Sequence, residues 1–130
     1  MSTQSIARAR LTVSCGPLAR PLASRLVMSV GAETDLPVDR VSEAAMIAET
    51  VVELCGEVAP DGFVELTVRA DERLLELRAG PLQPGGGQRL LGSDAGNGSG
   101  GVLRALATQA VVRQGRDGVE VLVLTVGEHP

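Results

Sequence analysis

The stretch PVDRVSEAAMIAETVVELCGEV, residues 37–58, carries the strongest helical pattern in the sequence. Apolar residues recur in it every three or four positions, which places them along one face of an α-helix. This stripe consists of Val38, Val41, Ala45, Ala48, Val52 and Cys55, and is widened by Ala44, Val51 and Val58. The pattern predicts an amphipathic helix that packs against a second layer and ends at the turn cluster GEVAPDG.

Alternating segments on both sides of this helix predict strands. GFVELTVRA (62–70) and RLLELRAG (73–80) alternate across a short turn, which is typical of a hairpin. In its first strand, Val64, Leu66 and Val68 would share one face. Residues 6–15 alternate in the same way, and the mostly apolar segment 117–128 predicts a final, central strand.

Two further segments have helical spacing. One contains Leu18, Leu22, Leu26 and Val30, and the other contains Val102, Leu103, Leu106 and Ala110. The order of elements is then β-α-α-β-β-loop-α-β. It predicts an α/β two-layer sandwich, with a mixed, mostly antiparallel sheet of at least four strands and three helices on one face. Residues 1–130 would form a single domain.

A glycine-rich stretch, Gly80 to Gly101, interrupts this pattern and holds more than half of the 16 glycines in the chain. One helix and one strand follow it, too little for a second domain. We therefore expect a lid loop within the domain, and we expect Pro81–Ser99 to lack regular structure over most of its length.

Composition excludes several classes of function. All 12 basic residues are arginine, so lysine-dependent Schiff bases and Walker phosphate loops are excluded. The net charge of −4, with arginines interspersed among acidic residues, argues against nucleic acid as a partner. No segment has the length of a signal peptide core or of a membrane span, so we expect a cytoplasmic protein with no membrane partner.

Cys15 and Cys55 lie far apart in apolar segments, and no second pair completes a zinc pattern. We expect two buried thiols in a reduced cytoplasm, with a disulfide as the alternative. The single histidine, His129, lies in the C-terminal tail without a partner for acid–base catalysis.

The order of a long helix, a strand pair ending in glycine, a glycine-rich lid, a helix and a final strand resembles the histidine-kinase-type (Bergerat) ATPases. The chain is most similar to their small branch, the bacterial anti-sigma-factor serine kinases, over roughly Leu11 to Val126. In that family the long helix carries E-x-x-x-N. The segment AMIAETVVELC places Glu49 at the catalytic Glu and Glu53 at the Asn that holds Mg²⁺.

Two further family motifs match weakly. The family's D-x-G-x-G corresponds to ELRAGPL, with Gly80 at the first glycine and Arg78 at the Asp that accepts from adenine. A guanidinium group cannot accept that hydrogen bond. The phosphate-binding lid corresponds to GNGSGGVLRAL, in which Gly98, Gly100 and Gly101 would offer backbone N–H groups.

The resemblance implies a regulatory protein of the anti-sigma-factor, partner-switching type. It would bind a sigma factor or an anti-sigma-factor antagonist, with a degenerate nucleotide site and no cofactor, and a homodimer is a further alternative. The competing reading is an active ATP-dependent serine kinase with Glu49 as base and Mg²⁺ on Glu53. Arg78 and Glu53 both argue against ATP. A third alternative keeps the fold and binds another small ligand. The glutamates Glu43, Glu49, Glu53 and Glu57 also fit the solvated side of a helix.

Overall fold

A computed structural model describes residues 7–95 and 101–127 of the chain. Its centre is a five-stranded antiparallel sheet in the order β1-β2-β3-β5-β4. The strands are β1 (Ala7–Ser14), β2 (Phe63–Ala70), β3 (Leu74–Leu82), β4 (Gln109–Gln114) and β5 (Glu120–Gly127). The expected two-layer α/β architecture is confirmed. The expectation of a mixed sheet is wrong, because every neighbouring pair of described strands is antiparallel.

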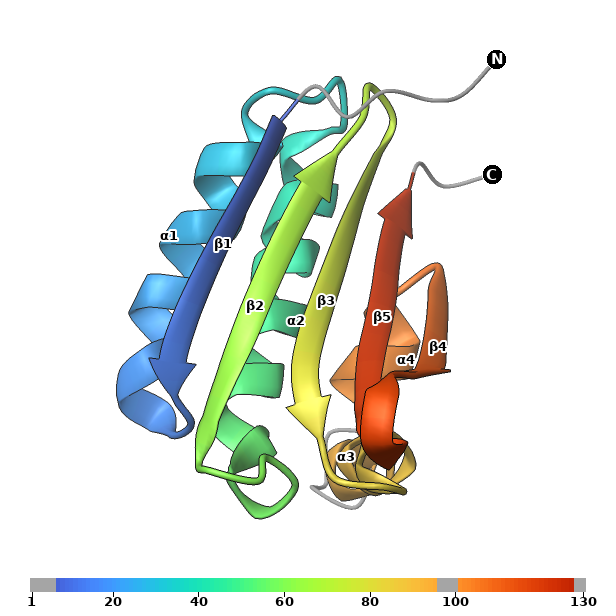
Figure 1. Cartoon of the computed structure of the whole chain (residues 1–130). Helices are drawn as coiled ribbons and strands as arrows, with labels where there is room; N and C mark the ends of the chain where they lie inside the picture. Colours follow the sequence, from blue (N-terminus) through green and yellow to red (C-terminus); the bar gives the residue numbers. More distant parts are fainter. Residues whose placement is uncertain (1–6, 96–100, 128–130) are drawn as a thin grey trace.

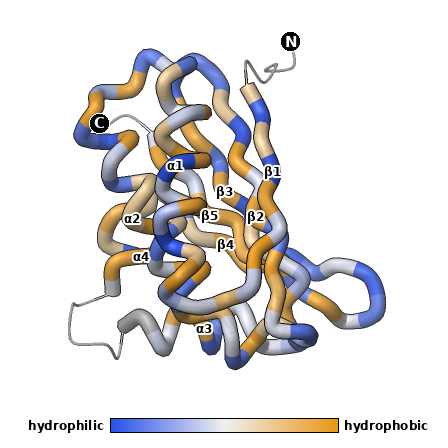
Figure 2. Tube along the Cα trace, turned by 90° about the vertical axis from the view of Figure 1, so that its left-hand side faces the viewer, coloured by the Kyte–Doolittle hydropathy of each residue, from blue (hydrophilic) through white to orange (hydrophobic). Residues whose placement is uncertain are grey.

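The helices lie on one face of the sheet and leave the other face bare (Figure 1). They are α1 (Arg20–Gly31), α2 (Val38–Leu54), α3 (Gly86–Ala95) and α4 (Val102–Leu106), one more than expected. The turned view in Figure 2 shows the same two layers from the side. Within the described part of the chain, none of the helices has the length and apolarity needed to cross a membrane.

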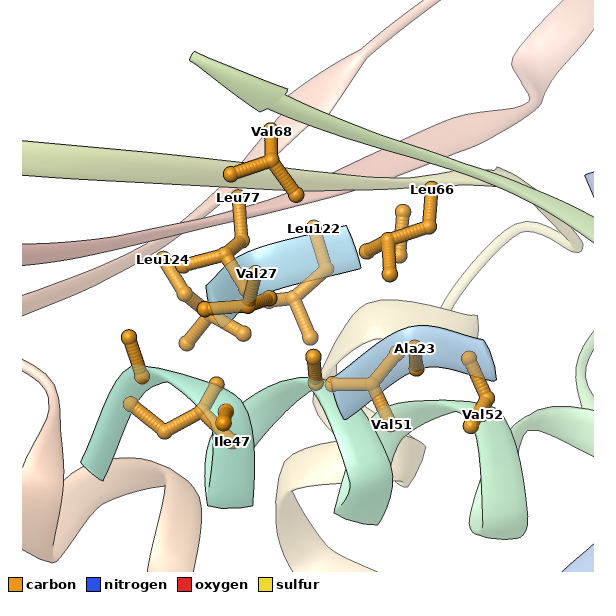
Figure 3. Packing of buried hydrophobic residues seen from close by; sticks show 14 of the residues in the cluster. Ala23, Val27, Ile47, Val51, Val52, Leu66, Val68, Leu77, Leu122 and Leu124 are labelled. Carbon is orange, nitrogen blue, oxygen red and sulfur yellow. The ribbon is translucent and has the colours of Figure 1, made fainter. Parts of the chain in front are cut away.

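The core forms where α2 meets the sheet. Ile47, Val51 and Val52 of α2 are buried against leucines and valines from β2, β3 and β5 (Figure 3). This confirms the apolar stripe predicted for α2, except at Val38, which is 74% exposed at the start of the helix. Leucine, valine and alanine thus fill the interior without any buried aromatic ring.

The apolar face predicted for this segment is right at Val30, which is buried, and at Leu26, which packs against the core, but it is wrong at Leu18 and Leu22. Leu18 is 92% exposed and Leu22 is 49% exposed, whereas Ala23 and Val27 are fully buried. The buried face of α1 is thus turned from the predicted one at the start of the helix and meets it at Val30. At its C-terminal end α1 approaches α2 closely, where a Cβ atom on Gly31 would lie 2.4 Å from Cγ1 of Val41.

Much of the glycine-rich stretch is regular, which contradicts the expectation for Pro81–Ser99. β3 continues to Leu82, and α3 covers Gly86–Ala95. Leu90 and Leu91 of α3 are buried in the core, which gives this glycine-containing helix its tertiary support. Residues 96–100 of the expected lid lie outside the described residues.

The helix predicted after the glycines is also shorter than expected. α4 ends at Leu106, and the chain then forms the edge strand β4. Val111 and Val112 are β-branched, and they pair with Val123 and Leu122 of β5. Pairing with the free edge of β5 therefore makes this segment a strand, although its apolar residues also have helical spacing.

Cys15 and Cys55 form a disulfide with a Cα–Cα distance of 5.8 Å, so the expectation of two free thiols is wrong. The backbone brings them together: Cys15 N donates to Gly62 O and Gly16 N donates to Val52 O, both at 2.8 Å. These bonds fix the end of β1 beside the end of α2. Disulfides are rare in reducing compartments, so the bond argues against the predicted cytoplasmic location, which stays a prediction.

Glu120 caps α3 from the neighbouring strand. Its buried carboxylate accepts hydrogen bonds from Gly85 N at 2.9 Å, Gly87 N at 3.0 Å and Gln114 Nε2 at 3.2 Å. The bonds from Gly85 and Gly87 lower the pKa of Glu120, against the opposing effect of burial. The charged form is thus the form that the fold favours.

A pH dependence of stability follows from this lowered pKa. The contribution of Glu120 is present above the pKa of an unfolded glutamate, about 4.3, and is lost as the pH falls through the lower folded pKa. We expect Glu120→Gln to destabilise the protein at pH 7, and the difference from wild type to shrink at acid pH. Urea denaturation at pH 7 and pH 3.5 measures it. The exposed control Glu33→Gln is expected to change the free energy of unfolding by less than about 0.5 kcal/mol. An equal effect of Glu120→Gln at both pH values would contradict the prediction.

Candidate functional site

Glu49 and Glu53 lie one turn apart on α2, and both contact Arg20 at the start of α1. Nη2 of Arg20 lies 3.9 Å from Oε1 of Glu49, and Nη1 of Arg20 lies 3.4 Å from Oε2 of Glu53. All three side chains are partly exposed. The packing of α1 against α2 places the guanidinium group between the two carboxylates.

This arrangement differs from what the E-x-x-x-N resemblance implies. In that motif the first position orients a water or hydroxyl group and the second holds Mg²⁺. Here a cation of the protein itself neutralises part of the charge that would attract a metal ion. Partly exposed ion pairs contribute about 0–1 kcal/mol each, so they set the local charge more than the stability. Arg20 thus offsets part of the negative charge at the two positions where the resemblance implies a catalytic base and Mg²⁺.

Arg78 and Gly80 lie on the other side of the sheet. Leu77 and Ala79 are buried, so the alternation along β3 turns Arg78 to the bare face, where its Nε donates to Glu76 Oε1 at 2.8 Å. A Cβ on Gly80 would lie 3.1 Å from the backbone oxygen of Glu120, which explains the glycine by close packing. The sheet thus separates this motif from Glu49 and Glu53 on α2.

Gly101 immediately precedes α4 and has the positive φ of 87° that favours glycine. α4 packs against α2, so Gly101 lies in the same layer as Glu49 and Glu53. Gly98 and Gly100 lie outside the described residues. Of the predicted nucleotide-binding positions, the structure therefore places Glu53 and Gly101 on the helical side and Gly80 on the bare side.

A hollow of about 400 Å³ on the bare face was missed by sequence reasoning. We call it the bare-face hollow; it is lined by Arg8, Glu65, Thr67, Arg69, Arg78, Gly80, Pro81 and Val121. Strand alternation predicts that Phe63, Glu65, Thr67 and Arg69 share the face opposite Val68, and the structure confirms this for Arg69; the same alternation could have placed Arg78 on the side opposite Leu77. The pairing of Arg8 with Arg69, and of Thr67 with Arg78, needed the register of three strands.

Within residues 7–95 and 101–127, no group of three or more His, Cys, Asp or Glu side chains is placed to hold a metal ion. No protein-family model matches the sequence, and a comparison with curated proteins finds no match.

Proposed function

We propose that this protein is a regulatory binding protein of the anti-sigma-factor, partner-switching type, with a Bergerat-type fold whose nucleotide site is degenerate. It binds a sigma factor or an anti-sigma-factor antagonist. The long helix α2, the hairpin of β2 and β3, the short helix α4 and the C-terminal strand β5 follow in the order of the resemblance, with α3 and β4 as additions to it.

The observation that carries the proposal is the contact of Arg20 with both Glu49 and Glu53. A kinase of this family needs those positions for a catalytic base and for Mg²⁺. A guanidinium group between them competes with the metal, and Arg78 offers no acceptor for adenine. Without a site for ATP·Mg²⁺, a protein with this fold would act through contact with other proteins.

Exposed apolar side chains on the helical layer supply a surface for such contact. Leu18 lies in the 3₁₀ turn just before α1, Leu22 lies in the first turn of α1, and Met46 is 49% exposed on α2. Large apolar side chains that fold outside the core mark candidate interfaces. We assign the partner contact to Leu18 and Leu22, which flank Arg20 in sequence.

Calorimetric titration against the sigma factors and anti-sigma-factor antagonists of the source organism tests the proposal. We expect a complex with one of them, and a dissociation constant that ATP·Mg²⁺ leaves unchanged. Leu18→Asp with Leu22→Asp is expected to weaken this complex about tenfold or more, because buried interface anchors carry most of the binding energy.

Phe63→Asp is the matched control for that measurement. Phe63 is also an exposed apolar residue, but it lies on β2, outside the helical layer. It is expected to leave the affinity unchanged. Binding to none of these partners, or a complex that forms only with ATP·Mg²⁺, would contradict the proposed function.

A further inference from the structure

The bare face of the sheet is basic although the chain as a whole carries a net charge of −4. Register and alternation place five arginines on this face, against two glutamates. The arginines are Arg8, Arg10, Arg69, Arg78 and Arg113, and the glutamates are Glu65 and Glu76. The fold thus separates charges that are interspersed along the sequence, and it concentrates positive charge opposite the helical layer, which Figure 1 shows behind the sheet.

Three of these arginines converge on the bare-face hollow from three adjacent strands. Arg8 of β1 lies opposite Arg69 of β2, and Arg78 of β3 lies opposite Thr67. Glu76 forms ion pairs with two of these arginines: its Oε1 lies 2.8 Å from Nε of Arg78 and 3.8 Å from Nη1 of Arg69. Arg8 makes no ion pair with any described residue.

The three arginines Arg8, Arg69 and Arg78 therefore carry more N–H donors than the protein supplies acceptors for. The Nε atom of Arg69 is buried and has no hydrogen-bond partner among the described residues. Such an N–H group is costly to leave unmatched. The carboxylate of Glu65 lies at the other end of the hollow, opposite Gly80, two strand positions from Thr67.

We infer that the bare-face hollow binds a small ligand through a multiply charged oxyanion group of the phosphoryl type. Arginine forks bind phosphate oxygens in pairs, and three forks from three strands suit a group with three terminal oxygens. The volume of about 400 Å³ lies within the range of small-molecule sites. Gly80 adds no side chain to the wall, and Thr67, which lines the hollow, is paired with Arg78 on the neighbouring strand.

The inference does not depend on the proposed function, because the hollow lies on the opposite face from Arg20, Glu49 and Glu53. A single-stranded nucleic acid is the less favoured occupant, since Phe63 is the one aromatic residue in the chain and stacking platforms need several. The small anionic ligand therefore fits the hollow better than a polymer does.

Titration with sodium pyrophosphate, followed by calorimetry and by amide NMR shifts, tests this site. We expect saturable binding with a dissociation constant of about 1 mM or tighter, and shifts centred on Thr67, Arg69 and Gly80. Arg8→Gln and Arg78→Gln are each expected to weaken binding about tenfold, as for the loss of a charge-assisted hydrogen bond. Acetate at matched ionic strength is expected to produce much smaller shifts.

Arg113→Gln is the matched control, because it removes an exposed arginine from the same face outside the hollow. It is expected to change the affinity by less than about twofold. Glu65→Gln removes a negative charge from the hollow and is therefore expected to strengthen pyrophosphate binding several-fold. The inference is overturned by unsaturable shifts, by equal losses in Arg113→Gln and Arg78→Gln, or by weaker binding in Glu65→Gln. Circular dichroism confirms that each variant is folded.

Discussion

Reduction of the Cys15–Cys55 disulfide is expected to lower the free energy of unfolding by about 4 kcal/mol. The bond joins residues 40 positions apart, so it restricts a long loop in the unfolded chain. In the folded protein it ties the end of β1 to the end of α2, next to the turn that bears Glu53. Because small domains are stable by only about 5–15 kcal/mol, reduction would remove a large fraction of the total.

Urea denaturation of the wild-type chain with and without reductant measures this loss. The double variant Cys15→Ala with Cys55→Ala is the control, and its stability is expected to be independent of reductant. Thiol alkylation of the unreduced protein followed by mass spectrometry checks the bond directly. Two alkylated cysteines, or identical denaturation curves for the wild-type chain in both conditions, would show that the disulfide does not form.

Arg40→Ala is expected to destabilise the protein by about 3–5 kcal/mol, the range for removing one partner of a buried charged network. Arg40 is 4% exposed, in the first turn of α2. Its Nε donates to Gly127 O at 2.8 Å and its Nη2 donates to Thr108 Oγ1 at 3.2 Å. Its Nη1 contacts the carboxylate of Glu43. The variant removes the donor to Gly127 O and leaves the partly buried Glu43 carboxylate without its ion pair, whereas Thr108 Oγ1 still accepts from Gly127 N.

The effect of Arg40→Ala is measured as a shift in the urea midpoint at pH 7. Arg25→Ala, at an exposed position on α1, is expected to change stability by less than about 0.5 kcal/mol. Arg40→Lys keeps the charge but cannot reach three acceptors as a fork does, so an intermediate loss is expected. If Arg40→Ala lowered the free energy of unfolding no more than Arg25→Ala does, the stabilising role of the buried Arg40 network would be contradicted.

Local patterns predicted the elements in which burial follows one repeat of apolar residues, either the helical repeat or the two-residue strand repeat. The stripe of α2 and the alternation of β2 both met the core as expected, because each presents one apolar face to one layer. The face of α1 could not be predicted in this way. Leu18 and Leu22 fit a helical period as well as Ala23 and Val27 do, and the choice depends on how closely α1 approaches α2.

Long-range contacts account for the other differences. α3 is poor in helix formers at its start, and its cap comes from Glu120, more than 30 positions along the chain. Arg40 pairs locally with Glu43, but its other partners, Gly127 and Thr108, lie 87 and 68 positions away, so its burial could not be predicted from local sequence. The spacing of Glu49 and Glu53 was visible in the sequence, whereas their contact with Arg20 depends on the packing of two helices. The position of Arg78 on the bare face follows from alternation along β3, whereas its neighbours there depend on the pairing of three strands.

An amide NMR titration with ATP·Mg²⁺ tests the proposal that the nucleotide site implied by the resemblance is degenerate in this chain. Residue-specific shifts distinguish the helical side from the bare-face hollow, which a calorimetric signal alone cannot do. We expect no saturable shifts at Glu49, Glu53 or Gly101. Any shifts are expected to be confined to the region of Arg78 and Gly80. Saturable shifts at Glu49 and Glu53 with micromolar affinity would contradict it, above all if Glu49→Ala kept that affinity and abolished phosphotransfer to a protein partner.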